Sequence, residues 1–160
     1  MTHCQICGRA IRAGNGLIAH HGYTRPGNGW QTKSCFGARY RPYEVACDAL
    51  VPAIESISRY LGQTQATLDD LMTDPPATIE HVRYRYDRVR RGFNNPREAW
   101  TADRPDGFDP HNPGIRANMP KTYEYAFATR TSGLRGNIRS ATESLAAFHK
   151  RLADWRPAAA

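Results

Sequence analysis

The sequence predicts a mostly helical α+β fold. A small N-terminal module with a β-hairpin precedes an antiparallel helical hairpin or bundle, which contains a long irregular loop. Two observations support this prediction. Residues 1–43 combine three cysteines with closely spaced glycines and few aliphatic residues. Residues 44–160 instead contain two long stretches whose apolar residues recur at steps of three and four, as on one face of a helix. We therefore divide the chain at residue 43.

The N-terminal module has a pattern typical of metal ligation. Cys4 and Cys7 are separated by two residues and precede Gly8, which is the form of a zinc knuckle. Cys35 supplies a third thiolate, and zinc needs four ligands. Thirteen residues separate His21 from Cys7 on one side and from Cys35 on the other. We therefore predict that Cys4, Cys7, His21 and Cys35 bind Zn²⁺.

Two other residues are alternatives for the fourth ligand. His20 adjoins His21 on the opposite face of a predicted strand, so only one of the two can ligate. Cys47 is the third choice, because it falls in a helical stretch and is equally explained as a buried thiol. A site with four protein ligands has no open position for water. We therefore expect a structural zinc ion that stabilises a segment too poor in aliphatic residues to fold alone.

A hairpin is expected to hold the ligands of this module. Residues 17–23 have the pattern of a short strand, and residues 26–29 are a strong turn signal. Residues 30–33 form the returning strand, which places Cys35 just beyond its end.

Three segments of this region resemble a group of small zinc-finger proteins from bacteriophages and prophages. They are His-His-Gly-Tyr-Thr-Arg-Pro-Gly-Asn-Gly at 20–29, Ser-Cys-Phe-Gly at 34–37 and Arg-Pro-Tyr-Glu-Val at 41–45. In that group a CxxCG knuckle is followed by HGYxRPGxG, CxG and PYE elements. The resemblance implies a zinc site in a phage or mobile-element setting rather than an activity. It also favours His21, since the recurring histidine of the group immediately precedes Gly-Tyr.

The first apolar stripe predicts a helix from about Pro52 to Met72. Its apolar residues alternate in steps of four and three, with one polar interruption at Thr64. Proline is favoured in the first helical turn, and Asp74-Pro75-Pro76 ends the helix. The expected use of this stripe is packing against another helix.

The second apolar stripe predicts a last helix from about Lys121 to Trp155. The same spacing is unbroken from Leu134 onward, whereas Gly133 and Gly136 are expected to kink or break the first part. Since the two stripes have similar lengths, we expect these helices to pack antiparallel and to supply the core.

The segment between these helices is harder to assign. Residues 78–93 have apolar residues at steps of three and four, so we expect a helix capped by Thr78, although residues 82–86 also alternate as in a strand. Residues 94–121 contain five prolines and are expected to form a long irregular loop.

The formal net charge of +7 is distributed unevenly. Residues 1–43 have six basic and no acidic residues, whereas residues 44–75 have six acidic residues and one arginine. Residues 83–91 interleave arginines with tyrosines, a composition that can contact phosphates and stack on bases. The same arginines could face solvent or pair with the acidic helix. The residues expected to contact nucleic acid or a protein partner are Arg25, Lys33, Arg39, Arg41, Arg83, Arg85, Arg88, Arg90 and Arg91.

Catalysis is the function class that the sequence supports least. It contains no phosphate-cradling glycine loop, no Ser/His/Asp arrangement and no paired carboxylates at a suitable spacing. Residues 109–113 include the His-Asn pair of HNH nucleases, but this loop is bounded by prolines and no predicted strand and helix frame it. We therefore expect a protein that is not an enzyme.

Two functions satisfy these observations. The first is a zinc-stapled accessory protein that binds nucleic acid through its arginine-rich surfaces. The second is a protein-interaction module, which in a phage setting would inhibit a host defence complex; a homodimer is a variant of it. No apolar run reaches the roughly 20 residues of a membrane span, and no signal peptide is visible. We expect a cytoplasmic protein, in the host cell if it is phage-encoded.

Overall fold

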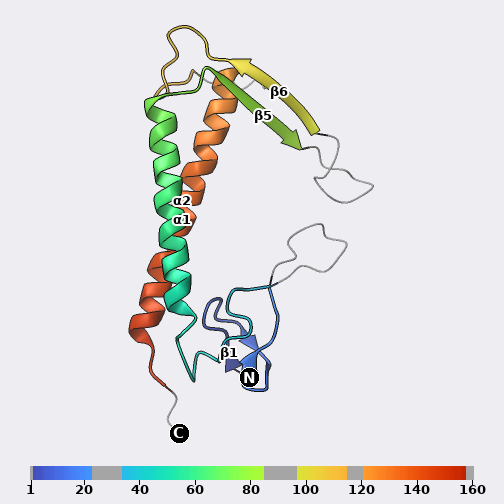
Figure 1. Cartoon of the computed structure of the whole chain (residues 1–160), viewed down its shortest axis with the longest axis vertical. Helices are drawn as coiled ribbons and strands as arrows, with labels where there is room; N and C mark the ends of the chain where they lie inside the picture. The colour runs from blue at the N-terminus through green and yellow to red at the C-terminus, as the bar shows by residue number, and fades with distance from the viewer. Residues whose placement is uncertain (1, 23–33, 85–96, 115–120, 158–160) are drawn as a thin grey trace. The chain divides into compact units, whose positions relative to one another are not determined.

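The computed structural model describes residues 2–22, 34–84, 97–114 and 121–157 (Figure 1). The elements in chain order are β1 (Thr2–His3), β2 (Ala10–Ile11), β3 (Ala13–Gly14), β4 (Leu17–Ile18), α1 (Leu50–Thr73), β5 (Thr78–Tyr84), β6 (Arg97–Asp103) and α2 (Tyr123–Asp154). Short antiparallel strand pairs and two long helices confirm the predicted α+β, mostly helical fold class. The chain forms two compact units, Met1–Tyr60 with Ala141–Ala160 and Leu61–Ser140.

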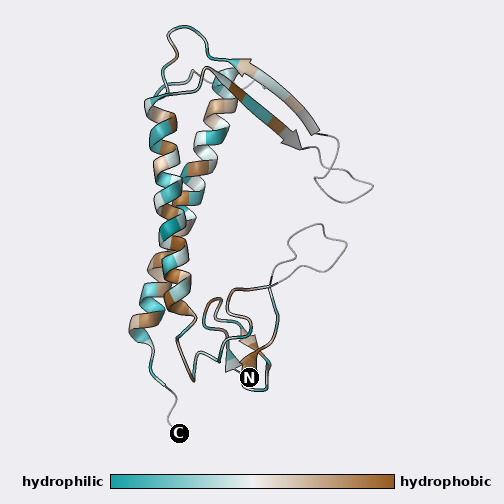
Figure 2. Ribbon diagram, viewed as in Figure 1, coloured by the Kyte–Doolittle hydropathy of each residue, from teal (hydrophilic) through white to brown (hydrophobic). Residues whose placement is uncertain are grey.

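Both long helices form where the apolar stripes predict them. Helix α1 begins two residues before Pro52, and α2 ends one residue before Trp155. In α1 all the stripe residues are buried or half-buried, and Figure 2 shows apolar and polar residues alternating along both helices. Neither helix, over the residues described, has an apolar stretch of the length that crossing a membrane requires.

We expected the two glycines to kink or break the first part of the last helix, and the expected break is wrong. Helix α2 continues through Gly133 and Gly136, and a Cβ at either position would meet nothing within 4 Å. Each glycine costs about 1 kcal/mol relative to alanine in a helix interior. Tertiary burial of the stripe on both sides of the glycines, including Thr131 and Ala141, offsets this cost.

Two short strand pairs shape the N-terminal part of the first unit. Strands β1 and β2 are antiparallel, with Thr2 opposite Ile11, and β3 and β4 are antiparallel, with Ala13 opposite Ile18. The predicted strand at 17–23 is therefore present over Leu17–Ile18, and its partner is β3. The predicted returning strand at 30–33 lies outside the described residues.

The second unit contains a β-hairpin that the sequence did not predict. Strands β5 and β6 pair antiparallel over seven residues each, with Ile79 opposite Ala102 and His81 opposite Trp100. The helix expected over 78–93 is wrong for residues 78–84, which form a strand. The partner strand supplies hydrogen bonds to their backbone groups, so the alternating pattern of apolar side chains decides the structure and the helical spacing does not. The loop expected over 94–121 is wrong for residues 97–103, which form that partner. Of the remainder, residues 104–114 are irregular, as predicted.

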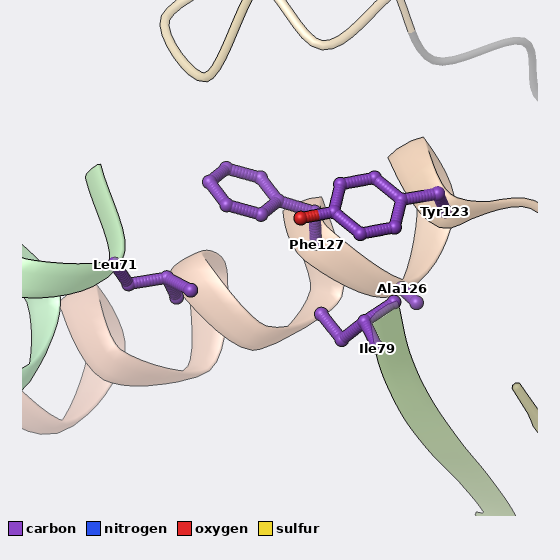
Figure 3. Packing of buried hydrophobic residues seen from close by; sticks show 5 residues of the cluster. All are labelled: Leu71, Ile79, Tyr123, Ala126 and Phe127. Atoms are coloured by element: carbon purple, nitrogen blue, oxygen red, sulfur yellow. The ribbon is translucent and has the colours of Figure 1, made fainter. Parts of the chain in front are cut away.

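The apolar core of the second unit lies where the end of α1, the start of α2 and β5 meet. Its buried residues are Leu71, Ile79, Tyr123, Ala126 and Phe127, which Figure 3 shows facing one another. Since Leu71 is near the C-terminus of α1 and the last three are in the first turns of α2, the two helices run antiparallel here, as predicted.

The irregular segment after β6 covers this core. Phe108 contacts the rings of Tyr123 and Phe127 edge-on, with centroids 4.9 Å apart in each case. The Tyr123 hydroxyl donates a hydrogen bond to the Pro76 carbonyl at 2.6 Å. These contacts tie the segments on either side of the hairpin to α2.

Candidate metal site

Cys4 and Cys7 lie in a tight turn that connects β1 and β2. The Gly8 amide donates to the Cys4 carbonyl, and the Cys4 amide donates to the Arg9 carbonyl, both at 3.0 Å. Gly8 has a φ of 70°, in the left-handed region that a residue without Cβ adopts at least cost. The turn therefore depends on the glycine that follows the second cysteine.

His21 and Cys35 approach each other from two segments that are far apart in sequence. The Cys35 amide donates to the His21 carbonyl at 2.8 Å, and the Ser34 hydroxyl donates to the same carbonyl at 3.2 Å. A Cβ on Gly22 would lie only 3.3 Å from the Cys35 Cβ. This close approach of the backbones brings the histidine and the third cysteine together.

The structure brings together the four residues that the sequence names as ligands. One ligand atom from each of Cys4, Cys7, His21 and Cys35 lies within 4.8 Å of all the others, close enough to hold one metal ion. The Cys4 and Cys35 sulfurs are 3.9 Å apart, and the Cys7 sulfur is 3.2 Å from His21 Nε2. Cys4 is fully buried and His21 is 8% exposed, whereas Cys7 is exposed.

A second hydrogen bond fixes the orientation of the His21 ring. His21 Nδ1 is 2.9 Å from the Ala19 carbonyl oxygen. Because a carbonyl only accepts, Nδ1 carries a proton, and Nε2 is the nitrogen that faces the Cys7 sulfur. Metal-binding histidines are typically oriented by such a bond from their other nitrogen.

The alternative fourth ligands lie outside this cluster. His20 is exposed, and its Nε2 accepts a hydrogen bond from Arg39 Nε at 3.0 Å. Cys47 is half-buried three residues before α1 and is not part of the cluster. Among the described residues, His21 is thus the fourth member of the group.

The electrostatics of the cluster favour a bound cation. The pKa of Cys35 is raised to about 11, with burial as the largest cause; the hydrogen bond from the Gly37 amide opposes the increase, and the neighbouring Cys4 and Cys7 sulfurs add to it. For Cys7, burial raises the pKa, but hydrogen bonds from the Arg9 amide and from His21 outweigh it and bring the value to about 7. One thiolate forms readily, and further thiolates repel it unless a cation lies between them.

Gly37 is a residue of the site whose role sequence reasoning missed. It is buried, and a Cβ at this position would lie 2.4 Å from the Cys4 sulfur and 3.1 Å from Ile6 Cγ1. Only a hydrogen fits there. The glycine itself was the available signal, since glycine often marks a site where another part of the chain approaches closely.

A buried glutamine connects the knuckle to the start of α1. Gln5 is fully buried, and its side-chain NH₂ donates to the Arg41 carbonyl and to Asp48, both at 2.8 Å. Its carbonyl accepts from the Ala49 amide at 2.7 Å. The hydrogen bond from Gln5 lowers the pKa of Asp48, and the ion pair with Arg41 at 2.9 Å lowers it further.

The C-terminal end of α2 is attached to the same module. Arg151 Nη2 donates to the Cys4 carbonyl at 3.1 Å, and its guanidinium lies 4.5 Å from the centre of the Tyr43 ring. The Tyr43 hydroxyl donates to the Arg151 carbonyl at 2.6 Å, and Trp155 Nε1 donates to the Tyr43 carbonyl at 2.6 Å. Arg151 and Tyr43 therefore have structural contacts that no sequence pattern predicts.

The predicted contact arginines are only partly described. Arg39 is exposed with a φ of 67°, and Arg41 is exposed but paired with Asp48. Arg83 lies in β5 opposite Glu98. The others lie outside the described residues: Arg25, Lys33, Arg85, Arg88, Arg90 and Arg91.

Residues 109–113, which include the His-Asn pair, form a local turn. The His111 amide donates to the Asp109 carboxylate at 2.8 Å, and the Asn112 amide donates to the Asp109 carbonyl at 3.1 Å. Asp109 thus accepts both hydrogen bonds, which stabilise the turn of the backbone over residues 109–112.

Comparisons with known proteins add no assignment to this site. Neither a family model, nor a curated protein, nor a solved structure matches the chain. The resemblance to phage zinc-finger proteins therefore stays a prediction from the sequence motifs.

Proposed function

We propose that the cluster of Cys4, Cys7, His21 and Cys35 holds a structural Zn²⁺. Tetrahedral zinc with Zn–S bonds of about 2.3 Å and Zn–N bonds of about 2.0–2.1 Å requires about 3.8 Å between two sulfurs and about 3.5 Å between sulfur and nitrogen. The separations of 3.9 Å and 3.2 Å lie close to these values. Three thiolates and one imidazole also form a donor set typical of zinc.

The proposed role of this ion is to cross-link segments that have little core of their own. All four positions are filled by protein, so the ion would supply structure rather than an activated water. It joins the β1–β2 turn to His21 and Cys35, and Gln5 and Arg151 extend that link to the helix ends.

We further propose that the zinc-stabilised protein binds nucleic acid without catalysing a reaction. The observation that carries this proposal is the exposed, uncompensated positive charge around the metal cluster. Arg9, Arg12 and Arg39 are exposed, and no described carboxylate forms an ion pair with them. Residues 1–43 include no acidic residue. The first two acidic residues after them already have partners, since Glu44 contacts His3 and Asp48 forms an ion pair with Arg41. Such a surface attracts phosphates.

A salt titration of the zinc-loaded full chain tests this function. Fluorescence anisotropy with labelled oligonucleotides should give an association constant that falls linearly with salt on logarithmic axes, by about 0.7–0.9 per phosphate contacted. Replacing Arg9, Arg12 and Arg39 by glutamine should flatten the slope. A matched control replaces Arg41 and Lys150, whose charges are already paired with Asp48 and Asp154. The absence of binding at low salt would rule out the proposal.

A protein-binding module is the second candidate function. It is favoured by two large apolar side chains near the start of α1, Val45 and Val51, which are 57% and 47% exposed. A nuclease-treated pull-down separates the candidates, because a partner held directly survives the nuclease and one bridged by nucleic acid does not. In a phage setting that partner would belong to a host defence complex.

A further inference from the structure

Phe36 is an exposed aromatic residue on a rigid part of the metal site. Its side chain is 50% exposed, although it lies between the candidate ligand Cys35 and the buried Gly37. The Ala38 amide donates to the Cys35 carbonyl at 3.0 Å, which closes the turn that carries Phe36. The ring is thus presented to solvent by a backbone that the metal cluster fixes on both sides.

Tyr40 supports one face of this ring. The two rings are 5.9 Å apart between centroids with an angle of 28° between their planes, which is a stacked arrangement. Tyr40 is itself fixed, since its carbonyl accepts a hydrogen bond from the Ile18 amide at 2.9 Å. The pair forms a short aromatic stack in which Phe36 stays half exposed.

Arg39 places a guanidinium on the same turn. Its backbone is in the left-handed region, with a φ of 67°, and its amide donates to the Ile18 carbonyl at 2.8 Å. Its side chain is exposed and donates to the neutral imidazole of His20, so its charge is not compensated there. The left-handed conformation is unfavourable for a residue other than glycine. Two backbone hydrogen bonds hold Arg39 in it, from the Arg39 amide to the Ile18 carbonyl and from the Ile18 amide to the Tyr40 carbonyl.

A half-exposed aromatic ring on the same turn as an arginine that pairs with no described carboxylate matches the chemistry of a nucleotide. Bases stack on aromatic rings irrespective of sequence, and arginine contacts the phosphate. In a duplex the bases are already stacked on one another, so only an unpaired base can occupy such a ring. Residues 1–43 contain no acidic residue. This favours a polyanion over a basic partner, which would need acidic residues to pair with, and over an apolar one.

We propose that the Phe36–Tyr40 stack is a subsite for an unpaired base of single-stranded nucleic acid, with Arg39 contacting an adjacent phosphate. This inference rests on the proposed nucleic-acid binding and specifies its substrate class. It predicts tighter binding of single strands than of duplexes with the same sequence.

The test uses the zinc-loaded full chain with single-stranded and duplex oligonucleotides. Phe36→Leu keeps an apolar side chain of similar size but removes the π face, and Phe36→Trp keeps the face and adds a fluorescent reporter. Loss of one stacked base should weaken single-strand binding roughly 5- to 150-fold in Phe36→Leu. The salt slope and the duplex affinity should not change. Phe36→Trp should retain affinity and be quenched on single-strand binding. Val45→Ala, which changes a comparably exposed apolar residue, is the control and should bind as the wild type does.

The outcomes separate this inference from the function on which it rests. Salt-dependent binding that is unaffected by Phe36→Leu, or a duplex bound as tightly as the single strand, would overturn the subsite while leaving nucleic-acid binding intact. No binding of either form, the result expected of a protein-binding surface, would overturn both. Zinc content measured for each variant shows whether the metal site is intact.

Discussion

A methyl group at residue 37 should disrupt metal binding even though Gly37 is not a ligand. In Gly37→Ala the new Cβ would lie 2.4 Å from the Cys4 sulfur and 3.1 Å from Ile6 Cγ1. Favourable non-bonded contacts between heavy atoms lie at about 3.5–4.0 Å. The sulfur and the methyl group must therefore separate by about 1 Å or more.

That displacement exceeds what the proposed coordination can absorb. Metal–ligand distances in a formed site stay within about 0.2 Å of their preferred values. Cys4 is fully buried, and its carbonyl accepts from Gly8 and Arg151, so its backbone has little freedom to follow. We expect zinc affinity to fall by at least about 10- to 100-fold, the range seen when groups that orient ligands are changed.

Competition with a chromophoric zinc chelator measures this loss directly. The matched control is Gly14→Ala, because Gly14 lies in β3 and a Cβ there meets nothing within 4 Å. If Gly37→Ala bound zinc within about threefold of the wild type, the packing of Cys4 against this turn would be refuted.

Three further predictions concern the contacts around the site and the separate core. Gln5→Leu should lower the free energy of unfolding by about 2–4 kcal/mol, because the Ala49 amide and its neighbours lose buried partners; a urea titration giving less than about 1 kcal/mol would contradict this. Trp155→Phe removes the bond to the Tyr43 carbonyl and should cost about 0.5–1.5 kcal/mol in the same titration without changing zinc affinity. Phe127→Ala should lower the free energy of unfolding by about 3–5 kcal/mol, because Phe127 is fully buried. It should leave the zinc affinity within about twofold of the wild type, since Phe127 belongs to the other compact unit, and a large loss of zinc affinity would argue against this separation.

The helices were predictable because their signal is local and repeated. The α1 stripe ends in Asp74-Pro75-Pro76, and the helix ends at Thr73. The hairpin of β5 and β6 was not predictable in this way. Its first strand also satisfies a helical spacing, and its second, beginning just after Pro96, lacks alternating apolar residues. The choice between helix and strand depends on a pairing that no single segment encodes.

The candidate metal site was predictable in its ligands but not in its surroundings. The spacing of the cysteines and a histidine midway between Cys7 and Cys35 predict the four ligands without knowledge of the fold. The roles of Gln5 and Arg151 depend on contacts across more than 40 and more than 140 residues, with Ala49 and Cys4 respectively, so no local pattern reveals them. The steric role of Gly37 likewise appears only when the two cysteine turns face each other.

X-ray absorption spectroscopy of the zinc-loaded full chain tests the central claim most directly. The proposed site requires three sulfur neighbours at about 2.3 Å and one nitrogen at about 2.0–2.1 Å around each zinc ion. In His21→Ala the nitrogen contribution of the ring should disappear, whereas His20→Ala should leave the spectrum unchanged. Four sulfur neighbours in the wild type would place Cys47 in the site instead of His21. A spectrum dominated by oxygen neighbours would contradict the closed Cys₃His site altogether.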